Sequence, residues 1–388
     1  MTSKPVIAVV GGGIGGLAAA AFLHRAGLPC TVYEQAKELK EVGAGLVLAP
    51  NLARLLRQLG VLEAMTATAV RLDVGWEFRR WQDGTVLSAE DLRESCADLY
   101  GEHTYTAHRA DLLAALASAV PPSALRLGKR CVSVTDGTLR FEDGERVTAD
   151  VVIGADGVHS VVRAAFVEAA APVYSGLCAF RALVPASSAP EPARRPAQTL
   201  WIGPGHHLVH YPISAGKLVN VVAFAPAGGY ETESWTATAS LEEFLAEFEG
   251  WDPRLRELIR AGGRPGRWAL LDQAPLRRWS HGPVTLLGDA AHPMFPFFGQ
   301  GAAQSVEDAA VLARCLASGA EPAEALRRYE AVRMPRTTRL QEASHGRAHV
   351  NHLPDGPEQR ARDAAFAGRD PLRDNGWIYG YDAGSDPG

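Results

Sequence analysis

The sequence predicts an α/β fold in which a Rossmann-like, dinucleotide-binding domain is interleaved with an antiparallel β-sheet domain and followed by a helical C-terminal region. Residues 6–34 have the pattern strand, glycine turn, helix, strand. Strand-like alternation begins at residues 71–87 and returns over 173–273, and residues 323–347 are helical and charged. At 388 residues the chain is too long for one simple core, so two domains are expected.

The N-terminal unit starts with an apolar strand, residues 6–10, and continues into a glycine-rich turn. In the G-x-G-x-x-G pattern, Gly11 permits the tight turn, Gly13 lets a pyrophosphate approach the backbone, and Gly16 lets helix and strand pack closely. The free N–H groups at the start of the helix receive the phosphates. Glu34 ends the second strand, where an acid binds a ribose hydroxyl. The predicted contacts of this unit are Gly11, Gly13, Ile14, Gly15, Gly16 and Glu34.

Composition excludes several classes of partner. The chain is 47% hydrophobic and 21% charged with a formal net charge of −5, so it has no basic excess for nucleic acid or an anionic membrane surface. No apolar run approaches the roughly 20 residues of a membrane span, and no signal peptide is recognised. The five cysteines are scattered without a C-x-x-C pair, which argues against disulfides and a zinc site. We expect a cytoplasmic protein, monomeric or homodimeric, without a metal.

A glycine-bearing loop and short strand, residues 43–51, follow the first unit. Because this loop lies near the predicted nucleotide crevice, Gly45 is expected to contact cofactor or substrate. Asn51 is a suitable N-cap for a helix over residues 52–59. Further along, a strand at residues 105–109 leads into a helix over 110–120, which prolines then stop.

Two further buried strands end in Gly-x-Asp or Gly-Asp. Residues 151–154 precede Asp156, and residues 284–287 precede Asp289. Parallel strands present their carboxyl ends to the ligand crevice, so both aspartates are predicted to face it. A loop rich in proline and phenylalanine follows Asp289, and Gly299-Gln300-Gly301 then opens a helix with bare N–H donors.

The clearest hairpin covers residues 206–225, with Ala215-Gly216 at its turn. The two-residue period of a strand places His207 and Tyr211 on one face and His206 and His210 on the other.

Three elements in this order resemble the single-component, FAD-dependent aromatic hydroxylases, the group A flavoprotein monooxygenases. The resemblance runs from residue 6 to beyond 310. Within the family the chain is most similar to enzymes acting on salicylate, 3-hydroxybenzoate and 6-hydroxynicotinate. The three elements are GGGIGG with Glu34, Gly154-Ala155-Asp156-Gly157 with Ser160 and Arg163, and Gly288-Asp289 with Pro293, Pro296 and Gly299-Gln300-Gly301. The similarity to the enzymes acting on those three acids rests on four further features: the tract Gly43-Ala44-Gly45, His207-x-x-x-Tyr211, Gln300-Gly301-Ala302, and the tail Trp377-Ile378-Tyr379-Gly380-Tyr381.

The resemblance implies FAD as cofactor, NADH or NADPH as a transient co-substrate, and O2. Asp289 would bind the ribityl hydroxyls, Arg109 would lie beside the phosphates, and Asp156 would organise the loops near the flavin. The amides of residues 299–302 suit the negative charge of reduced flavin. The cofactor-binding set is completed by Gly45, Arg109, Asp156, Asp289, Pro296, Gly299, Gly301 and Ala302.

The family's chemistry is hydroxylation of a phenol or aromatic acid by a flavin C4a-hydroperoxide, which favours a substrate that has lost its phenolic proton. His207 is the expected base, with Tyr211 beside it and Gln300 lining the pocket from the flavin side. Tyr105 is a second candidate.

Two arginines on the expected sheet, Arg79 and Arg181, are candidates to pair with a substrate carboxylate. The 6-hydroxynicotinate branch carries a histidine in the strand after the Gly-Ala-Gly tract, where this chain has Leu46, Val47 and Leu48. This difference favours a bulkier or less polar ring than a pyridine.

The predicted FAD-binding domain comprises residues 1–72, 101–172 and 276–320. The substrate domain comprises residues 73–100 and 173–275, and a helical segment and tail cover 321–388. Alternatives are epoxidation or oxidative rearrangement of a polycyclic natural product by the same flavin chemistry, and a flavin-binding regulatory protein without turnover. A halogenase is disfavoured because no Trp-x-Trp-x-Ile-Pro tract is present.

Overall fold

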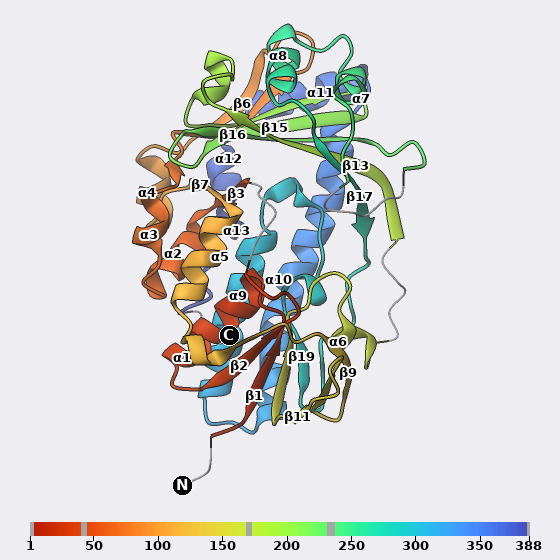
Figure 1. Cartoon of the computed structure of the whole chain (residues 1–388). Helices are drawn as coiled ribbons and strands as arrows, with labels where there is room; N and C mark the ends of the chain where they lie inside the picture. The colour runs from red at the N-terminus through yellow and green to blue at the C-terminus, as the bar shows by residue number, and fades with distance from the viewer. Residues whose placement is uncertain (1–3, 40–44, 168–172, 231–236, 386–388) are drawn as a thin grey trace.

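The computed structural model describes residues 4–39, 45–167, 173–230 and 237–385, so Gly43 and Ala44 of the predicted tract lie outside it. Figure 1 shows a six-stranded sheet at one end of the molecule and a seven-stranded sheet at the other. The long helix α10 (Pro322–Asn351) runs between the two sheets. The predicted α/β fold with a helical C-terminal region is confirmed.

The six-stranded sheet has the order β18-β19-β12-β1-β2-β8. Its three central strands are parallel, so their carboxyl ends, which carry Gly11, Glu34 and Asp156, meet at one edge. The strands are β1 (Ile7–Val10), β2 (Cys30–Glu34), β8 (Leu125–Leu127), β12 (Val151–Gly154), β18 (Ser280–His281) and β19 (Val284–Leu286).

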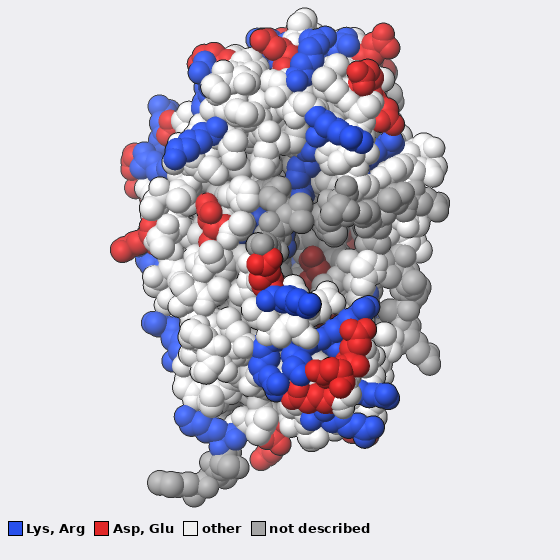
Figure 2. Space-filling view, viewed as in Figure 1, with Lys and Arg blue, Asp and Glu red and all other residues white. Residues whose placement is uncertain are grey.

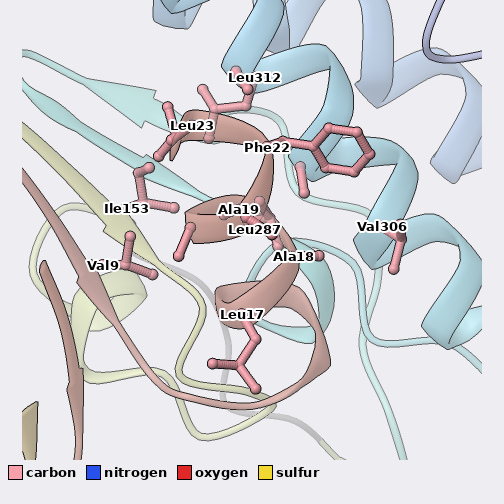
Figure 3. Packing of buried hydrophobic residues seen from close by; sticks show 14 of the residues in the cluster. Val9, Leu17, Ala18, Ala19, Phe22, Leu23, Ile153, Leu287, Val306 and Leu312 are labelled. Atoms are coloured by element: carbon pink, nitrogen blue, oxygen red, sulfur yellow. The ribbon is translucent and has the colours of Figure 1, made fainter. Parts of the chain in front are cut away.

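Helix α1 (Ile14–Arg25) lies between this sheet and helix α9 (Gly301–Ala317). Figure 3 shows α1 with the strand residues Val9 and Ile153 on one side and α9 on the other, and Leu23 of α1 near Leu312 of α9. The alanine-rich middle of α1 is fully buried, because small side chains let the helix be covered on both sides. This packing fixes the start of α1, and with it the glycine turn.

The seven-stranded sheet has the order β17-β13-β16-β15-β14-β5-β6. The predicted hairpin is confirmed as β15 paired with β16. One sheet face packs on α7 (Leu241–Glu247) and α8 (Pro253–Ala261), and the other packs on the loop before α9. The strands are β5 (Val74–Arg80), β6 (Val86–Asp91), β13 (Val173–Pro185), β14 (Ala197–Gly203), β15 (His206–Ile213), β16 (Leu218–Pro226) and β17 (Gly266–Asp272).

Smaller elements complete the molecule. The helices are α2 (Pro50–Gln58), α3 (Leu62–Thr66), α4 (Ser95–Tyr100), α5 (Arg109–Ser118), α6 (Val161–Ala164), α11 (Pro357–Ala367), α12 (Pro371–Asp374) and α13 (Gly376–Tyr379). The strands are β3 (Gly45–Leu48), β4 (Val70–Arg71), β7 (Tyr105–His108), β9 (Cys131–Thr135), β10 (Thr138–Phe141) and β11 (Arg146–Thr148). The limits of the two domains stay a prediction. Among the described residues, no helix has the length and apolar character needed to span a membrane.

The predicted capping role of Asn51 is wrong. Helix α2 begins at Pro50 with Ala49 as its N-cap, because proline is already suited to the first helical turn. The side chain of Asn51 is buried and donates to Gln300 and Glu307 instead.

Candidate active site

A cleft of about 750 Å³ opens at the carboxyl edge of the six-stranded sheet. Figure 2 shows the molecule hollowed near the middle of this face, with charged side chains around the hollow. The cleft collects residues from many of the motifs. Its lining is Val10, Gly11, Gly13, Tyr33, Glu34, Gln35, Gly45, Arg109, Lys129, Arg130, Cys131, Ala155, Asp156, Gly157, His159, Val161 and Arg181.

The glycine turn has the shape that a bound phosphate needs. A Cβ on Gly11, whose φ is +103°, would lie 2.3 Å from the Ala155 oxygen, and a Cβ on Gly16 would lie 1.9 Å from the Gly11 oxygen. A Cβ on Gly15 would lie 2.6 Å from Leu287. Gly13 has open space in front of it and caps α1 without a side-chain hydrogen bond. The amides from Ile14 onward therefore have room for a phosphate group.

Glu34 is fixed beside this turn. Its carboxylate accepts hydrogen bonds from the amides of Gly12, at 2.6 Å, and Ala36, at 2.7 Å. These bonds hold the carboxylate at the end of β2, in the cleft lining, where it can accept from ribose hydroxyls.

Asp156 lies in the lining of the same cleft and organises the turn that follows it. Its carboxylate accepts from the Ser160 hydroxyl and, at 3.1 Å, from the Val162 amide. Burial raises the pKa of Asp156, although these hydrogen bonds oppose the shift. Arg163 in the following turn donates to the Ala290 oxygen at 3.0 Å, and so joins this wall to the turn that carries Asp289.

The turn with Asp289 and the start of α9 are not part of the cleft lining, so their contacts with FAD stay a prediction. Asp289 is exposed, in a short turn that begins at Gly288. Gly299, with a φ of +62°, ends the short turn that begins at Pro296. Helix α9 then starts at Gly301 with no side-chain cap and with open space in front of it, so the amides at Gly301 and Ala302 can meet an anion.

Gln300 is 2% exposed and faces the helices behind α9. Its side-chain oxygen accepts from Asn51 at 3.0 Å and from Gln304 at 3.3 Å. Its predicted place in the substrate pocket stays a prediction.

Behind the start of α9 lies a buried charged network that the sequence analysis missed. Arg333 of α10 donates to Glu307 and Asp308 of α9, each at 2.7 Å. Asp308 also binds His292 at 2.6 Å and accepts from the Gly288 amide at 3.0 Å. The network therefore holds the turn on which Asp289 sits. The signal available in the sequence was the pair of adjacent acids in α9, a helix that is mostly apolar.

His207 and Tyr211 lie on the inner face of the seven-stranded sheet, as the strand period predicts. His207 is 2% exposed, stacks on Phe224 with ring centroids 4.5 Å apart, and meets the edge of Phe297 from the loop before α9. His206 and His210 face the other way, toward Glu247 and Trp201. The seven-stranded sheet and the loop before α9 thus contact each other at His207.

The pKa values of this pair follow from their burial. Burial, helped by His352, His206 and Arg347, holds the pKa of His207 well below its usual range. The imidazole is therefore neutral near pH 7, with a lone pair free on one of its two ring nitrogens. Burial raises the pKa of Tyr211, which remains a phenol.

Gly45 connects the cleft to the same sheet face. Its amide donates to the Asn220 side chain at 2.8 Å. A Cβ on Gly45 would lie 2.7 Å from both Asn220 and Tyr211, so only glycine fits without displacement.

The structure separates the two arginine candidates. Arg79 bonds Glu77 at 2.8 Å near Trp201, in the cluster covered by α7 and α8. Arg181 lines the cleft, and its guanidinium lies 4.4 Å from the Trp268 ring centroid.

The second base candidate, Tyr105, lies against His103 and outside the cleft lining. Arg109 begins α5 and lines the cleft, as expected.

Comparisons with known proteins agree with this geometry. A family model described as an FAD binding domain matches residues 4–344. A 3-amino-4-hydroxybenzoate 2-monooxygenase of Streptomyces platensis is 44% identical over 386 residues, 98% of this chain and 97% of the relative. A 6-hydroxynicotinate 3-monooxygenase of Pseudomonas fluorescens is 36% identical, over 98% of this chain and 96% of the relative.

Solved structures are similar over the whole length. A salicylate hydroxylase substrate complex superposes with a TM-score of 0.84 at 29% identity, covering 99% of this chain and 97% of the other. A Klebsiella pneumoniae protein complexed with FAD and uric acid gives 0.83 at 28% identity, covering 97% and 96%. The chain therefore belongs to the family of FAD-dependent aromatic hydroxylases that its motifs indicated, and its cofactor is FAD.

Proposed function

We propose that this protein hydroxylates the ring of an aromatic acid that carries hydroxyl and amino groups, of the 3-amino-4-hydroxybenzoate type, with NADH or NADPH and O2. Three relatives named for 3-amino-4-hydroxybenzoate, at 42–44% identity, match 97–98% of the chain. The relatives named for 6-hydroxynicotinate are 34–36% identical. Bound FAD would take electrons from the nicotinamide and pass them to O2, which would supply the oxygen atom.

The observation that carries the proposal is the buried His207 at the meeting of sheet and loop. In this proposal the neutral imidazole takes the phenolic proton, which makes the ring a better nucleophile. Phe224 and Phe297 exclude water from the imidazole. A dry site favours transfer of oxygen to the ring over its loss as peroxide.

Arg181 is the proposed partner of the substrate carboxylate. It pairs in register with Val222, a residue of the inner-face cluster, and it lines the cleft. A guanidinium binds a carboxylate in a directed, two-pronged geometry, which would orient the ring relative to His207. Tyr211 lies on the same face and forms part of the wall against Gly45.

The test is a substrate panel. Purified protein loaded with FAD is mixed with NADH or NADPH and 3-amino-4-hydroxybenzoate, salicylate, 3-hydroxybenzoate or 6-hydroxynicotinate. We expect the amino-hydroxy acid to accelerate nicotinamide oxidation most and to yield a product with one added oxygen. Acceleration by 6-hydroxynicotinate alone would contradict the proposed substrate class.

A further inference from the structure

His207 has a hydrogen-bond partner far away in the sequence. Its Nδ1 lies 2.6 Å from Nε2 of His352, which directly follows α10, and the two ring centroids are 4.8 Å apart. The backbone oxygen of His352 accepts from the Gly205 amide at 3.0 Å, so the end of α10 is fixed to the start of β15. The geometry of the pair is therefore set by two elements rather than by a mobile side chain.

The two histidines differ in their access to water. His207 is 2% exposed, whereas His352 is only half-buried. His207 uses Nδ1 for its hydrogen bond to His352, so Nε2 is the nitrogen that would receive a substrate's proton. The pair thus extends from the buried sheet face, where His207 lies, toward the surface, where His352 lies.

We propose that His207 and His352 form a two-histidine relay that carries the phenolic proton of the substrate to solvent. The O–H bond of the phenol breaks as an N–H bond forms at Nε2 of His207. The proton on Nδ1 of His207 passes to Nε2 of His352, and the proton on Nδ1 of His352 passes to water. The substrate is left as its phenolate, and no electrons change hands.

The surroundings explain why a single histidine would not suffice. The charged or titratable groups that act on His207 are His352, its strand neighbour His206, and Arg347 of α10. A cation on His207 would therefore be buried beside a guanidinium, and no carboxylate among the described residues acts on it. Burial likewise lowers the pKa of His352, to about 4. Because the protonated form of each ring is disfavoured, a proton that enters the pair is transferred onward and does not remain on either ring.

This inference rests on the proposed function, because it needs His207 to receive the proton. Its test is His352→Gln, which keeps a hydrogen-bonding side chain of similar reach but cannot pass a proton on. With 3-amino-4-hydroxybenzoate as the probe, proton release to an indicator dye after mixing should slow at least about tenfold at pH 7. The defect should shrink as pH rises toward the phenol's own pKa, about 10 for tyrosine, because the substrate then arrives ionised.

The matched control is His349→Gln, on the exposed side of the same helix, which should behave like the wild type. His352→Ala with imidazole in the buffer is the second variant, and imidazole should restore its release rate. Wild-type release rates in His352→Gln, or an Ala variant that imidazole does not rescue, would overturn the relay.

A measurement without substrate separates the relay from the proposed function. A strong hydrogen bond between the rings should give a deshielded imidazole N–H signal in the NMR spectrum, absent from His207→Gln and from His352→Gln. If no aromatic acid is turned over but the signal is present, the proposed substrate is wrong and the pair stands. If the wild type turns over its substrate without the signal, the relay is wrong and the hydroxylase stands.

Discussion

The nucleotide cleft takes its shape from backbone, whereas the sheet face around His207 takes its shape from side chains brought together from distant segments. At the glycine turn the closest approach, Gly16 against the Gly11 oxygen, lies within the turn itself, and Gly11 in turn meets the backbone of Ala155. Around His207 the partners come from β16, the loop before α9 and the end of α10. Local motifs can therefore specify the first region but not the second.

The largest effect is expected at the glycine turn. Gly16→Ala would place a Cβ 1.9 Å from the Gly11 oxygen, and because backbone cannot yield as a side chain does, we expect loss of more than about 3 kcal/mol of stability and of bound flavin. Thermal unfolding and the FAD absorbance of the purified protein measure both.

Gly13→Ala is the matched comparison. Nothing lies within 4 Å of its Cβ position, so the flavin-free protein should unfold at the wild-type temperature while FAD binds more weakly. Equal destabilisation by both variants would mean that the turn is not specified by backbone packing.

A smaller but chemically selective effect is expected in the sheet. His207→Phe should lower hydroxylation about 10²–10⁴-fold while nicotinamide oxidation continues and releases peroxide. The reason is that flavin reduction does not use the phenolic proton. The amounts of product and of peroxide formed per nicotinamide oxidised measure how far the two reactions are uncoupled.

His210→Phe lies on the opposite face of the same strand and is the control. It removes the acceptor of the Trp201 indole and should cost about 1–3 kcal/mol of stability without uncoupling the reaction. Uncoupling in His210→Phe but not in His207→Phe would reverse the assignment of the two faces.

The buried network tests how the two regions are joined. Arg333→Met removes the fully buried cation that Glu307 and Asp308 share, although Arg336 still pairs with Glu307 and His292 with Asp308. It should lower the free energy of unfolding by about 3–5 kcal/mol. Arg327→Met, at an exposed pair with Glu324, should cost less than about 1 kcal/mol in the same denaturant titration. Similar losses in both variants would argue against a structural role for the network.

The network also predicts a pH dependence. Burial alone would raise the pKa of Asp308, but His292 and Arg333 outweigh it and lower the pKa from 3.8 to about 2. A carboxyl with a depressed pKa stabilises the fold fully above its unfolded value and loses that contribution as pH falls. Stability should therefore decline between about pH 4 and 2, and less steeply in Asp308→Asn. An unchanged slope in that variant would contradict the assignment.

The smallest effect is expected for the carboxylate partner. Arg181→Met should raise the KM for an aromatic acid by about 10–100-fold, the equivalent of about 1.5–3 kcal/mol for hydrogen bonds to a charged group, with less effect on kcat. Arg79→Met, whose side chain is paired with Glu77, should leave KM unchanged. Steady-state kinetics with the best acid of the panel compare the two variants. A rise in KM for Arg79→Met alone would mean that Arg79, and not Arg181, binds the substrate carboxylate.

The sequence could predict what is encoded within a few neighbouring residues. The positions of the glycine turn, Glu34 and Asp156 in the cleft lining follow from strand and turn geometry, and so do the two faces of β15. Asn51 was misread because capping preference is a local rule, whereas Gln300 and Glu307, which take its hydrogen bonds, lie some 250 positions away.

His352 illustrates the limit of prediction from a single sequence. The helix was expected to end at residue 347, but α10 continues to Asn351, and the extra turn carries His352 to β15. No motif marks this residue, because its role depends on where a 30-residue helix ends relative to a strand of the seven-stranded sheet. Asp308 and Arg333 were missed for the same reason, since their partners lie on different elements.

The central claim is that cleft and sheet face form one site, at which FAD delivers oxygen to an aromatic ring. The most direct test is turnover of 3-amino-4-hydroxybenzoate under ¹⁸O2 with the FAD-loaded protein, followed by mass spectrometry of the product. We predict one ¹⁸O atom per product molecule, with nicotinamide oxidation that depends on the acid. Acid-dependent oxidation that yields only peroxide, or a product without the label, would contradict the account.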